Sequence, residues 1–480
     1  MSAGVKFGTD GWRGITASDF TFSNVILVAE AIRRHLTAGG AERRVLLIGY
    51  DTRFLARNFA HSTAGYLGAN GLSVAVADAP IPTPAIAFAV KHLGAAGAIQ
   101  FTASHNPYYY NGLKFIPDFA GPAMPETTDA ITAIIKELTD CGWSGEYSTR
   151  VDFGKTFEVR SDYFAHLDEL IDANAIKNAG IKVLYNALWA TGSGWLDGYL
   201  RGRGIEVETM NAERDVLFGG SMPDPSYEIL KPMESRLAGN GFSLGLSTDG
   251  DSDRFAAFDG RGGFATANKL IPLIAHYLIV ERGMPGDLVR TVSTSALLDR
   301  IAAAHGRGLI ETKVGFKYVG HEIRGGALCG GEESGGFSMA GHVPEKDGIL
   351  ACLLACEIAA VLGGGSLSRC FEIIEETYGP SVTKRTDLHL TEEGKAAVLE
   401  QAKSLADHYA ERGGELWGIP VVKVVSIDGY KFMLAGDRSI LVRASGTEPV
   451  VRIYLEARTE AELEELDEQI TRFIELTIKN

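Results

Sequence analysis

Ser104 is the residue whose type and surroundings point most clearly to chemistry. It lies in the run Thr-Ala-Ser-His-Asn-Pro at 102–107, directly after a largely apolar stretch at 94–101. A helix cannot easily continue through Asn106, because the residue before a proline is pushed out of the α region. The pattern predicts a rigid turn that presents Ser104 at the end of a strand, with Lys114 bringing a cation back toward it. For this segment alone, a turn that only satisfies its own backbone is an equal alternative.

Three closely spaced aspartates form the second candidate site. Asp249, Asp251 and Asp253 alternate with other residues, and Arg254 follows them. Carboxylates this close repel one another, and their hard oxygens suit magnesium or calcium. An EF-hand is excluded, because its sixth position needs glycine but holds Arg254, and its twelfth needs glutamate but holds Gly260. Three protein oxygens leave an octahedral ion short of ligands, which water or a phosphoryl oxygen would complete. A solvated acidic loop is the alternative.

A glycine-rich loop at 330–336, Gly-Gly-Glu-Glu-Ser-Gly-Gly, is the third candidate. Glycines allow the backbone to approach a ligand closely. Glu332 and Ser334 between them supply acceptors and a donor that suit the vicinal hydroxyls of a sugar ring. On this stretch alone, a flexible surface loop is the alternative.

A fourth segment, Arg-Ala-Ser-Gly-Thr-Glu-Pro at 443–449, has the composition of a phosphate cradle, and Arg452 follows it. The amides and hydroxyls of Ser445, Gly446 and Thr447 predict an anion-binding concavity, which two arginines would complete by binding phosphate bidentately. The segment is not a Walker loop, which needs Gly-Lys-Ser/Thr before a helix. A structural Ser-Gly turn is the alternative.

A fifth segment lies near the N-terminus, at 7–14. Its three glycines surround Arg13, which suggests a loop that positions the guanidinium rather than a helix. An ordinary surface loop explains these residues at least as well.

The secondary structure that positions these segments is predicted to be an alternation of strands and helices. Short apolar runs alternate with helical patterns over most of the chain, which predicts α/β layers with mixed or parallel sheets. Ligands usually bind at the ends of such strands. The predicted buried strands lie at 45–48, 72–76, 98–101, 181–184, 244–247 and 289–292, and examples of the predicted helices lie at 23–36 and 353–361.

The pattern changes near residue 372. Strand-like pieces at 421–427, 439–442 and 450–455 precede a last amphipathic helix, whose start has a capping box formed by Thr459 and Glu462. These elements predict a smaller α+β domain at the C-terminal end. The predicted domains are residues 1–155, 156–258, 259–371 and 372–480.

Composition narrows the class of protein. The chain has 480 residues, 45% of them hydrophobic, and a formal net charge of −15, which argues against binding to nucleic acid or to anionic membranes. The five cysteines are odd in number and lack the spacing of a metal finger. Neither a signal pattern nor an apolar run approaching about 20 residues is present in the sequence. Together these features predict a soluble protein of the reducing cytosol.

Taken together, the five segments resemble the motifs of the α-D-phosphohexomutase family, and they occur in the family's order from one end of the chain to the other. The resemblance implies an α/β protein of four domains in a heart-shaped arrangement. Three related α/β domains and a smaller, mobile C-terminal α+β domain would surround a central cleft.

The resemblance also implies roles for individual residues. Ser104 would carry a phosphoryl group, one oxygen of which would join Asp249, Asp251 and Asp253 as a ligand of Mg²⁺. The implied catalytic residues besides Ser104 are Lys114 as general acid or base, His105 as its partner or as an orienting group, and Arg13 and Arg254 as cations that stabilise the transferred group. The implied substrate-binding residues are Glu332, Ser334, Lys346, Arg443, Ser445, Gly446, Thr447 and Arg452.

The implied activity is the interconversion of hexose 1-phosphate and hexose 6-phosphate through a phosphoserine enzyme, with hexose 1,6-bisphosphate as intermediate and activator. The partner would be a small sugar phosphate, with neither nucleic acid nor membrane involved, and the protein would be a monomer or a homodimer. A phosphoglucosamine mutase and a non-catalytic sugar-phosphate-binding protein are the alternatives.

The choice of sugar depends on departures within the third segment. Some relatives in the family that this chain resembles use both mannose and glucose and have histidine where this chain has Gly336. His342 and Lys346 lie a few residues later and are candidates to replace that acid or base. Amino-sugar mutases tend to have glutamine where Glu333 stands, and residues 313–318 resemble the glucose-selecting loop of phosphoglucomutases. These features favour glucose, with mannose as the second candidate.

Overall fold

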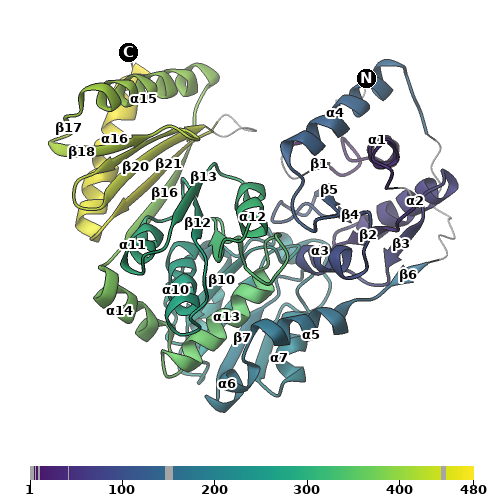
Figure 1. Ribbon diagram of the computed structural model, residues 1–480, viewed down its shortest axis with the longest axis horizontal. Helices are drawn as coiled ribbons and strands as arrows, with labels where there is room; N and C mark the ends of the chain where they lie inside the picture. The colour runs from purple at the N-terminus through teal and green to yellow at the C-terminus, as the bar shows by residue number, and fades with distance from the viewer. Residues whose placement is uncertain are drawn as a thin grey trace.

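The computed structural model describes residues 5, 7–8, 11–41, 43–145, 155–444 and 450–479. Within these residues, four β-sheets of six, five, four and six strands follow one another along the chain. They form an arc in which the first and the last sheets stand at opposite ends (Figure 1). Each sheet with its helices is called here the first, second, third or fourth unit. The fold is the predicted one, with three α/β units and a C-terminal unit dominated by an antiparallel sheet.

The first unit has the strand order β1-β5-β4-β2-β3-β6. Strands β2, β3, β4 and β6 pair in parallel, whereas β5 turns back antiparallel to β4 and places Lys114 opposite Gln100. The loop at 102–107 therefore lies between two paired strands. The elements are β1 (Trp12–Ile15), α1 (Phe22–Ala38), β2 (Leu46–Tyr50), α2 (Ala56–Ala69), β3 (Val74–Ala77), α3 (Thr83–His92), β4 (Gly97–Phe101), β5 (Tyr110–Pro117), α4 (Pro125–Asp140) and β6 (Thr156–Phe157).

The second unit has the strand order β11-β10-β9-β7-β8. Strands β9 and β10 form an antiparallel hairpin, and the aspartate loop connects them. The elements are α5 (Arg160–Leu170), α6 (Ala173–Asn178), β7 (Lys182–Asn186), α7 (Leu196–Gly202), β8 (Glu206–Met210), a 3₁₀ helix (Phe218–Gly220), α8 (Tyr227–Leu230), α9 (Pro232–Leu237), β9 (Leu244–Thr248), β10 (Phe255–Asp259) and β11 (Phe264–Ala265).

The third unit has the strand order β13-β12-β14-β15. The glycine-rich loop connects β14 to β15, which pair antiparallel. Helix α13 is apolar around most of its circumference and is buried along most of its length, as expected for a helix inside a large core. The elements are α10 (Ala267–Val280), β12 (Leu288–Thr291), α11 (Leu297–Ala304), β13 (Leu309–Thr312), α12 (Phe316–Arg324), β14 (Cys329–Gly331), β15 (Phe337–Met339), α13 (Gly348–Val361) and α14 (Leu367–Tyr378).

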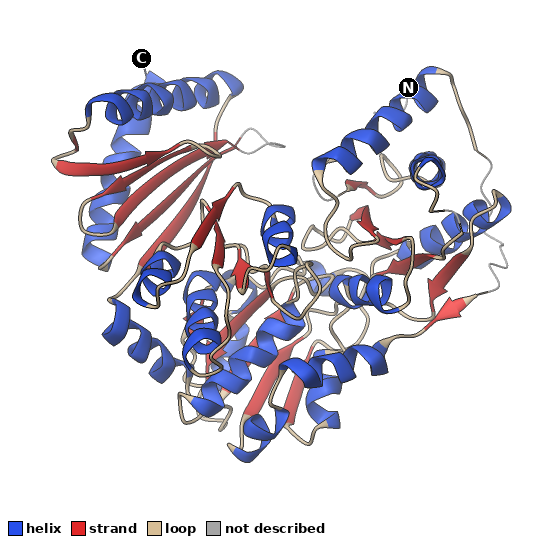
Figure 2. Cartoon of the chain, viewed as in Figure 1, coloured by secondary structure: helices blue, strands red, loops and turns tan. Residues whose placement is uncertain are grey.

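The fourth unit is an antiparallel sheet against which two helices pack (Figure 2). The predicted capping box is confirmed, since Thr459 Oγ1 accepts from Glu462 N at 3.2 Å and Glu462 Oε2 accepts from Thr459 N at 3.1 Å. The sequence predicted three strands here, and the structure adds others. The elements are β16 (Val382–His389), α15 (Glu392–Arg412), β17 (Glu415–Leu416), β18 (Ile419–Val425), β19 (Tyr430–Leu434), β20 (Arg438–Ala444), β21 (Val450–Ala457) and α16 (Glu460–Lys479).

Among the described residues, two of the five clusters of buried apolar side chains are the largest. One continuous cluster of buried side chains runs through the first three units, from Phe7 to Tyr378. The fourth unit has a separate core, from Val398 to Ile474. Within the described residues, no helix combines the length and the apolar character needed to cross a membrane.

Candidate functional site

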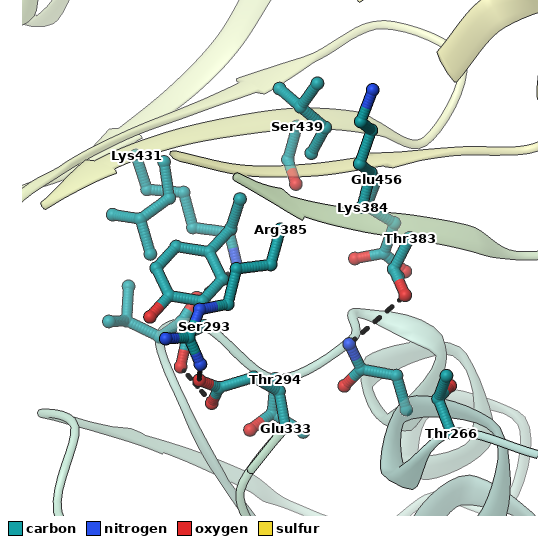
Figure 3. A pocket seen from close by; sticks show the side chains of 15 residues that line it. Thr266, Ser293, Thr294, Glu333, Thr383, Lys384, Arg385, Lys431, Ser439 and Glu456 are labelled. Carbon is teal, nitrogen blue, oxygen red and sulfur yellow. Dashed lines mark hydrogen bonds and ion pairs between the residues drawn. The ribbon is translucent and has the colours of Figure 1, made fainter. Parts of the chain in front are cut away.

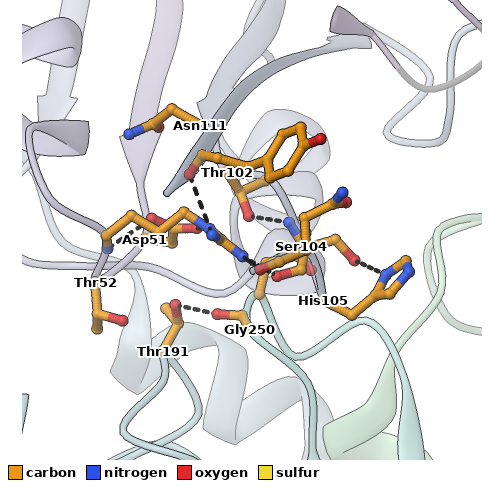
Figure 4. A network of polar contacts seen from close by, with 12 residues as sticks. Asp51, Thr52, Thr102, Ser104, His105, Asn111, Thr191 and Gly250 are labelled. Carbon is orange, nitrogen blue, oxygen red and sulfur yellow. Dashed lines mark hydrogen bonds and ion pairs between the residues drawn. The ribbon is translucent and has the colours of Figure 1, made fainter. Parts of the chain in front are cut away.

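Ser104 occupies a strained turn directly after β4. Its φ of +51° lies in the left-handed region, which non-glycine residues adopt rarely and at a cost in energy. Thr102 Oγ1 accepts a hydrogen bond from Ser104 N at 2.9 Å, and the serine is only 1% exposed. Figure 4 shows Thr102 and His105 on the two sides of Ser104. The predicted presentation of this serine by a tight turn is what the structure shows.

Arg53 holds this turn in place, and sequence reasoning missed it. Its fully buried guanidinium donates to four main-chain carbonyl oxygens of the serine loop, at distances of 2.6 to 3.2 Å. Asp51 accepts from both Nε and the main-chain N of Arg53. The signal was an Asp-Thr-Arg run immediately after a buried strand, the same position that Ser104 occupies after the neighbouring strand. The accepting carbonyl groups belong to Ser104, Asn106, Pro107 and Tyr110.

The aspartate loop lies directly against the serine. Ser104 Oγ donates to Asp249 Oδ2 at 2.8 Å. Asp249, Asp251 and Asp253 are all buried, and one carboxylate oxygen of each lies within 4.8 Å of the others. The backbones approach so closely that a Cβ added at Gly250 would lie 2.2 Å from the Ser104 carbonyl oxygen. The structure therefore brings together two segments that lie far apart in the sequence.

The carboxylate cluster fits a divalent cation. Asp251 Oδ1 and Asp253 Oδ1 are buried and have no hydrogen-bond partner among the described residues. Burial and the charges of Asp253 and Asp251 raise the pKa of Asp249 well above its usual range. A cation bound between these oxygens would satisfy the orphaned atoms and remove the repulsion.

Two lysines partly balance the negative charge of this cluster. Lys114 Nζ donates to Asp251 Oδ2 at 2.6 Å and to Asp253 Oδ2 at 2.8 Å. Lys346 Nζ lies 3.3 Å from Asp253 Oδ2. Burial alone would lower the pKa of Lys114, but the two carboxylates outweigh it and raise that pKa. Lys114 is therefore protonated in this structure, and it can donate that proton readily only when the carboxylates hold it less tightly, because the best catalytic pKa lies near the working pH.

Three further predicted residues lie at the same place. His105 Nδ1 is 3.3 Å from Ser104 Oγ, and burial together with the charges of Arg254 and Arg13 lowers the pKa of His105 well below its usual range. His105 is thus a neutral imidazole beside the serine. Arg13 Nη1 donates to Asn106 Oδ1 at 2.7 Å, and the main-chain N of Arg254 donates to Asp249 Oδ1 at 3.1 Å.

Main-chain hydrogen bonds tie the aspartate loop to the neighbouring units. Thr83 N, in the first unit, donates to the carbonyl oxygen of Asp251 at 2.9 Å. In the third unit, Gly348 N donates to the carbonyl oxygen of Ser252 at 3.1 Å. The glycine-rich loop joins as well, because Gly336 forms an antiparallel bridge with Arg254. Three units therefore fix the position of the carboxylates.

Position 336 of the glycine-rich loop has no room for a side chain larger than that of glycine. A Cβ at Gly336 would lie 2.5 Å from Cδ of Lys346 and 3.3 Å from the Phe316 ring. The lysine stem thus occupies the space that a larger residue at 336 would need. Glu332 Oε1 accepts from Gly315 N at 2.8 Å, and Ser334 lies partly exposed in the turn between β14 and β15.

Glu333 points toward the fourth unit. Its Oε2 accepts from Ser293 Oγ at 2.6 Å, and its Oε1 lies 3.8 Å from Arg385 of β16 (Figure 3). The carboxylate is thus engaged at the contact between the third and fourth units. This geometry weakens the sequence argument that the residue type at 333 reads the sugar directly.

His342 is not brought to the serine. Its Nε2 lies 2.8 Å from Asp347 Oδ2, and its Nδ1 lies 3.0 Å from Nε2 of His166 on α5. The imidazole is fully buried and both ring nitrogens are engaged. The histidine therefore fastens the loop before α13 to the second unit, and we assign it no proton-transfer role.

The predicted phosphate-binding arginines stand side by side on the fourth unit. Arg443 on β20 and Arg452 on β21 are direct cross-strand partners. Arg443 Nε donates to Asp428 Oδ2 at 2.9 Å, and Arg452 Nε lies 3.5 Å from Asp387 Oδ2. Three predicted binding residues lie outside the described residues: Ser445, Gly446 and Thr447.

Comparison with known families identifies all four units. The chain matches the α/β/α domains I, II and III of phosphoglucomutase/phosphomannomutase at residues 4–140, 161–262 and 266–378. It matches the C-terminal domain of the same family at 390–473. The boundaries predicted from the sequence, after residues 155, 258 and 371, stay predictions.

Individual relatives cover nearly the whole chain. A phosphoglucomutase/phosphomannomutase of Thermococcus kodakarensis is 32% identical over 99% of this chain and 98% of its own. A protein of Methanothermobacter thermautotrophicus, described as a probable phosphoglucosamine mutase, is 30% identical over 98% of each chain. A crystal structure from Thermus thermophilus, provisionally described as a phosphomannomutase, superposes with a TM-score of 0.85 at 33% identity, covering 99% of this chain and 100% of that one. With four matched domains in order and relatives of this similarity, the chain belongs to the phosphoglucomutase/phosphomannomutase family of mutases, within the α-D-phosphohexomutase superfamily.

Proposed function

We propose that this protein interconverts the 1- and 6-phosphates of a hexose, with glucose as the favoured sugar. The observation that carries the proposal is the hydrogen bond from Ser104 Oγ to Asp249 Oδ2, at 2.8 Å, within a buried cluster of three aspartates. A serine buried against a cation site is suited to carry a phosphoryl group, because the cation offsets its charge.

The chemistry consists of two phosphoryl transfers. In the first, the bond between Ser104 Oγ and phosphorus breaks and a free hydroxyl of the hexose monophosphate forms the new oxygen–phosphorus bond, which gives a hexose 1,6-bisphosphate. The hydroxyl proton leaves to a base, and Ser104 Oγ gains a proton. In the second, the other phosphate of the bisphosphate returns to Ser104. The bisphosphate must present its two ends in turn, so the phosphate that is not transferred must bind the same arginines in both orientations.

The residues around Ser104 divide these tasks. Protonated Lys114 is the candidate acid, and neutral His105 is the candidate to orient the serine or to share the proton. Arg13 and Arg254 would bind oxygens of the moving group. On the fourth unit, Arg443 and Arg452, together with the loop 445–447, would hold the phosphate that is not transferred.

The three aspartates would hold Mg²⁺, and one oxygen of the phosphoserine would join them. The bound ion would stabilise the negative charge of the transferred group. Its binding needs the Lys114 ammonium to share Asp251 and Asp253, both of which keep a second oxygen without a hydrogen-bond partner among the described residues.

The preference for glucose rests on the third unit. Lys346 occupies the space beside Gly336, where relatives that accept both sugars have histidine, and it reaches Asp253. Phosphoglucosamine mutase is the second candidate. It is favoured by the relatives, because proteins from Methanothermobacter thermautotrophicus and Methanobrevibacter smithii, each 30% identical, are described as probable phosphoglucosamine mutases.

The cellular setting and the partners belong to the same proposal. All five cysteines are free thiols, which suits a reducing cytosol. The partner is a small sugar phosphate, and the net charge of −15 makes nucleic acid an unfavourable one. A monomer or a homodimer stays a prediction.

One assay tests the proposal. Turnover is measured on the 1-phosphates of glucose, mannose, glucosamine and N-acetylglucosamine, with Mg²⁺ and a trace of the matching bisphosphate. We expect the fastest turnover on glucose 1-phosphate, and equal or faster turnover on glucosamine 1-phosphate would overturn the choice of sugar. Ser104→Ala should remove nearly all activity while the circular dichroism spectrum is unchanged. A near-normal rate in this variant would rule out the phosphoserine mechanism.

A further inference from the structure

The contact between the third and fourth units combines an apolar cluster, several hydrogen bonds and a cavity. Its apolar part consists of Val292 from the third unit with Leu441 and Tyr454 from the fourth, and Val314 packs against them. Beside this cluster lies a cavity of about 160 Å³, lined by residues of both units (Figure 3). A single water needs only about 10–15 Å³, so the cavity has room for several waters. Hydrogen bonds cross the interface as well, since Glu456 accepts from Ser295 Oγ at 2.6 Å and from Ala296 N at 2.9 Å, and Lys431 Nζ donates to the Val292 carbonyl oxygen at 2.9 Å.

One oxygen atom joins a predicted phosphate-binding arginine of the fourth unit to the backbone of the third. Asp428 Oδ2, in the turn between β18 and β19, accepts from Arg443 Nε at 2.9 Å. The same oxygen accepts from the main-chain N of Val314 in the third unit at 3.0 Å. Charge-assisted hydrogen bonds are roughly twice as strong as neutral ones. Asp428 thus orients a predicted phosphate-binding arginine and holds a segment of another unit.

The main-chain amide of Gly315, which follows Val314, connects this contact to the glycine-rich loop. Gly315 N donates to Glu332 Oε1 at 2.8 Å, so the consecutive amides of Val314 and Gly315 bind Asp428 and Glu332. Gly315 has a φ of +129°, a conformation that side-chain-bearing residues rarely adopt. A single stretch of backbone therefore links Arg443 on the phosphate side to Glu332 on the sugar side.

We propose that Asp428 is a positioning residue that couples phosphate binding on the fourth unit to the sugar-facing loops of the third. The proposal rests on the proposed function, since it takes Arg443 as a ligand of the phosphate that is not transferred. When phosphate binds Arg443 and draws the fourth unit inward, Asp428 carries the movement to Val314, and Gly315 passes it to Glu332. The enzyme then presents its sugar contacts only when a phosphate is held.

A second path runs beside the first but is weaker. Arg452 lies 3.5 Å from Asp387, which binds Arg385, and Arg385 lies 3.8 Å from Glu333. These longer contacts transmit less than the direct bonds of Asp428, because ion-pair hydrogen bonds weaken with distance. The bonds of Glu456 and Lys431 to the third unit remain when Asp428 is substituted, so the fourth unit should stay attached while the link from Arg443 to Val314 is lost.

The test compares Asp428→Ala and Asp428→Asn with Asp407→Ala. Asp407 is a matched control, because it forms an exposed ion pair with Lys403 on α15, within the fourth unit. Hydrogen exchange of the amides at 313–318 is measured by mass spectrometry, with and without glucose 1,6-bisphosphate, alongside kcat and KM for glucose 1-phosphate and mannose 1-phosphate.

We expect the bisphosphate to slow exchange at 313–318 in the wild-type protein and in Asp407→Ala. In Asp428→Ala this slowing should disappear, KM should rise on the order of tenfold, and the ratio of kcat/KM between the two sugars should fall. Asp428→Asn retains an acceptor for Val314 N, so it should lose less of the slowing while KM still rises. A residue that only stabilised the fold would alter neither the sugar ratio nor the ligand-dependent exchange.

Opposite results separate the two proposals. If Asp428→Ala shows the wild-type slowing and an unchanged sugar ratio while the wild-type protein is an active mutase, the coupling is wrong and the function stands. If the wild-type protein neither turns over a hexose phosphate nor binds the bisphosphate, both proposals fail together. If KM rises equally for both sugars in Asp428→Ala and the bisphosphate still slows hydrogen exchange at 313–318, Asp428 orients Arg443 without coupling the units.

Discussion

At the scale of single residues, the buried charges around Ser104 explain why the serine loop has one conformation. Ser104 itself is strained, and strain persists only where the surroundings over-determine it. Arg53 supplies that restraint, since a buried guanidinium is stable only when its donors are used, and here they bind four carbonyl oxygens and Asp51. The shape of the loop is thus set by a side chain that touches no reacting group.

Arg53→Ala is predicted to cost both stability and activity. Removing one partner of a buried pair costs about 3–5 kcal/mol, because Asp51 and the loop carbonyls lose their donors. Urea unfolding and mutase rate measure the two losses, and Arg53→Lys should restore part of the stability but little of the rate, since an ammonium cannot reproduce the fork. Arg57→Ala, at an exposed position of α2, is the control and should change neither. Normal turnover in Arg53→Ala would show that the loop needs no such restraint.

Gly336→Ala is predicted to lower the rate through Lys346. The added methyl would meet Cδ of Lys346 at 2.5 Å, so the lysine must leave Asp253 or the loop must shift. Overpacking of this kind costs about 1–3 kcal/mol, which corresponds to roughly tenfold or more in rate if it falls on the transition state. The measurement is the kcat of Gly336→Ala and of Lys346→Ala, and the two variants should have similar values. Gly202→Ala is the control, because nothing lies within 4 Å of its new methyl; a fully active Gly336→Ala would contradict the role given to Lys346.

At the scale of elements, apolar runs predicted the strands that form the sheet centres. The pieces at 45–48, 98–101 and 244–247 became β2, β4 and β9, since a buried strand needs a continuous apolar run. The polar edge strand β16 was missed, because it alternates partly buried and exposed residues and contains three charged residues and a histidine. Strand β19 was not predicted, because it begins with Tyr430 and Lys431 and so lacks a continuous apolar run. Its formation is determined by tertiary packing.

The residues of the candidate site also divide into those that a local sequence pattern predicts and those that it does not. Ser104, Lys114 and the aspartates were predicted because each lies in a short segment whose local pattern is informative. Arg53 and Asp428 were missed because their roles are set by contacts with residues 51 and 114 positions away in the chain, which no local pattern contains. The catalytic role predicted for His342 stays a prediction, and the sequence could not show that its ring contacts Asp347 and His166.

The packing of α1 on α2 makes the first unit sensitive to acid. Glu30 of α1 accepts from Arg33, Arg34 and, on α2, Tyr66. Burial alone would raise the pKa of Glu30, but these donors lower it to about 2 from 4.5. Because the folded pKa lies below the unfolded one, the carboxylate contributes its full stability above pH 4.5 and loses it as the pH falls toward 2.

Glu30→Gln is therefore predicted to lower the melting temperature at pH 7 but much less near pH 3. The loss at neutral pH corresponds to about 2–3 kcal/mol. Melting curves of the wild-type protein and of Glu30→Gln between pH 3 and 7 give the difference between their melting temperatures, called the gap, as a function of pH. Glu137→Gln, whose side chain is 70% exposed, serves as control and should show a small gap throughout. A gap that widened as the pH fell would reverse the sign assigned to Glu30.

At the scale of the whole molecule, the two cores divide the protein unequally. One continuous core runs through the first three units, and the second and third also have smaller clusters of their own. The fourth unit has a separate core, and it meets the third through apolar side chains, a cavity and several hydrogen bonds. Cooperative units coincide with continuous cores, so the chain should melt in two steps rather than four. The separate core of the fourth unit would let that unit move toward the first when a phosphate binds it.

Calorimetry of two core variants tests this division. Leu466→Ala, in the core of the fourth unit, should lower one transition, and Leu278→Ala, in α10, should lower the other. Each substitution removes a fully buried leucine and costs about 2–5 kcal/mol in its own unit. Movement of both transitions by the same amount in either variant would show that the cores are coupled.

The construction of the site from distant segments also governs the order of events during synthesis. Asp249 lies 145 positions after Ser104, and translation proceeds at about 5–20 residues per second, so on the order of ten seconds separates their appearance. Domains fold as units, N-terminal first, and the first unit can complete its sheet before any aspartate of the second exists. During that interval Ser104 has no carboxylate beside it and Lys114 has no counter-charge. The nascent chain therefore carries a folded but inert serine, and its chemistry begins only when the later units dock.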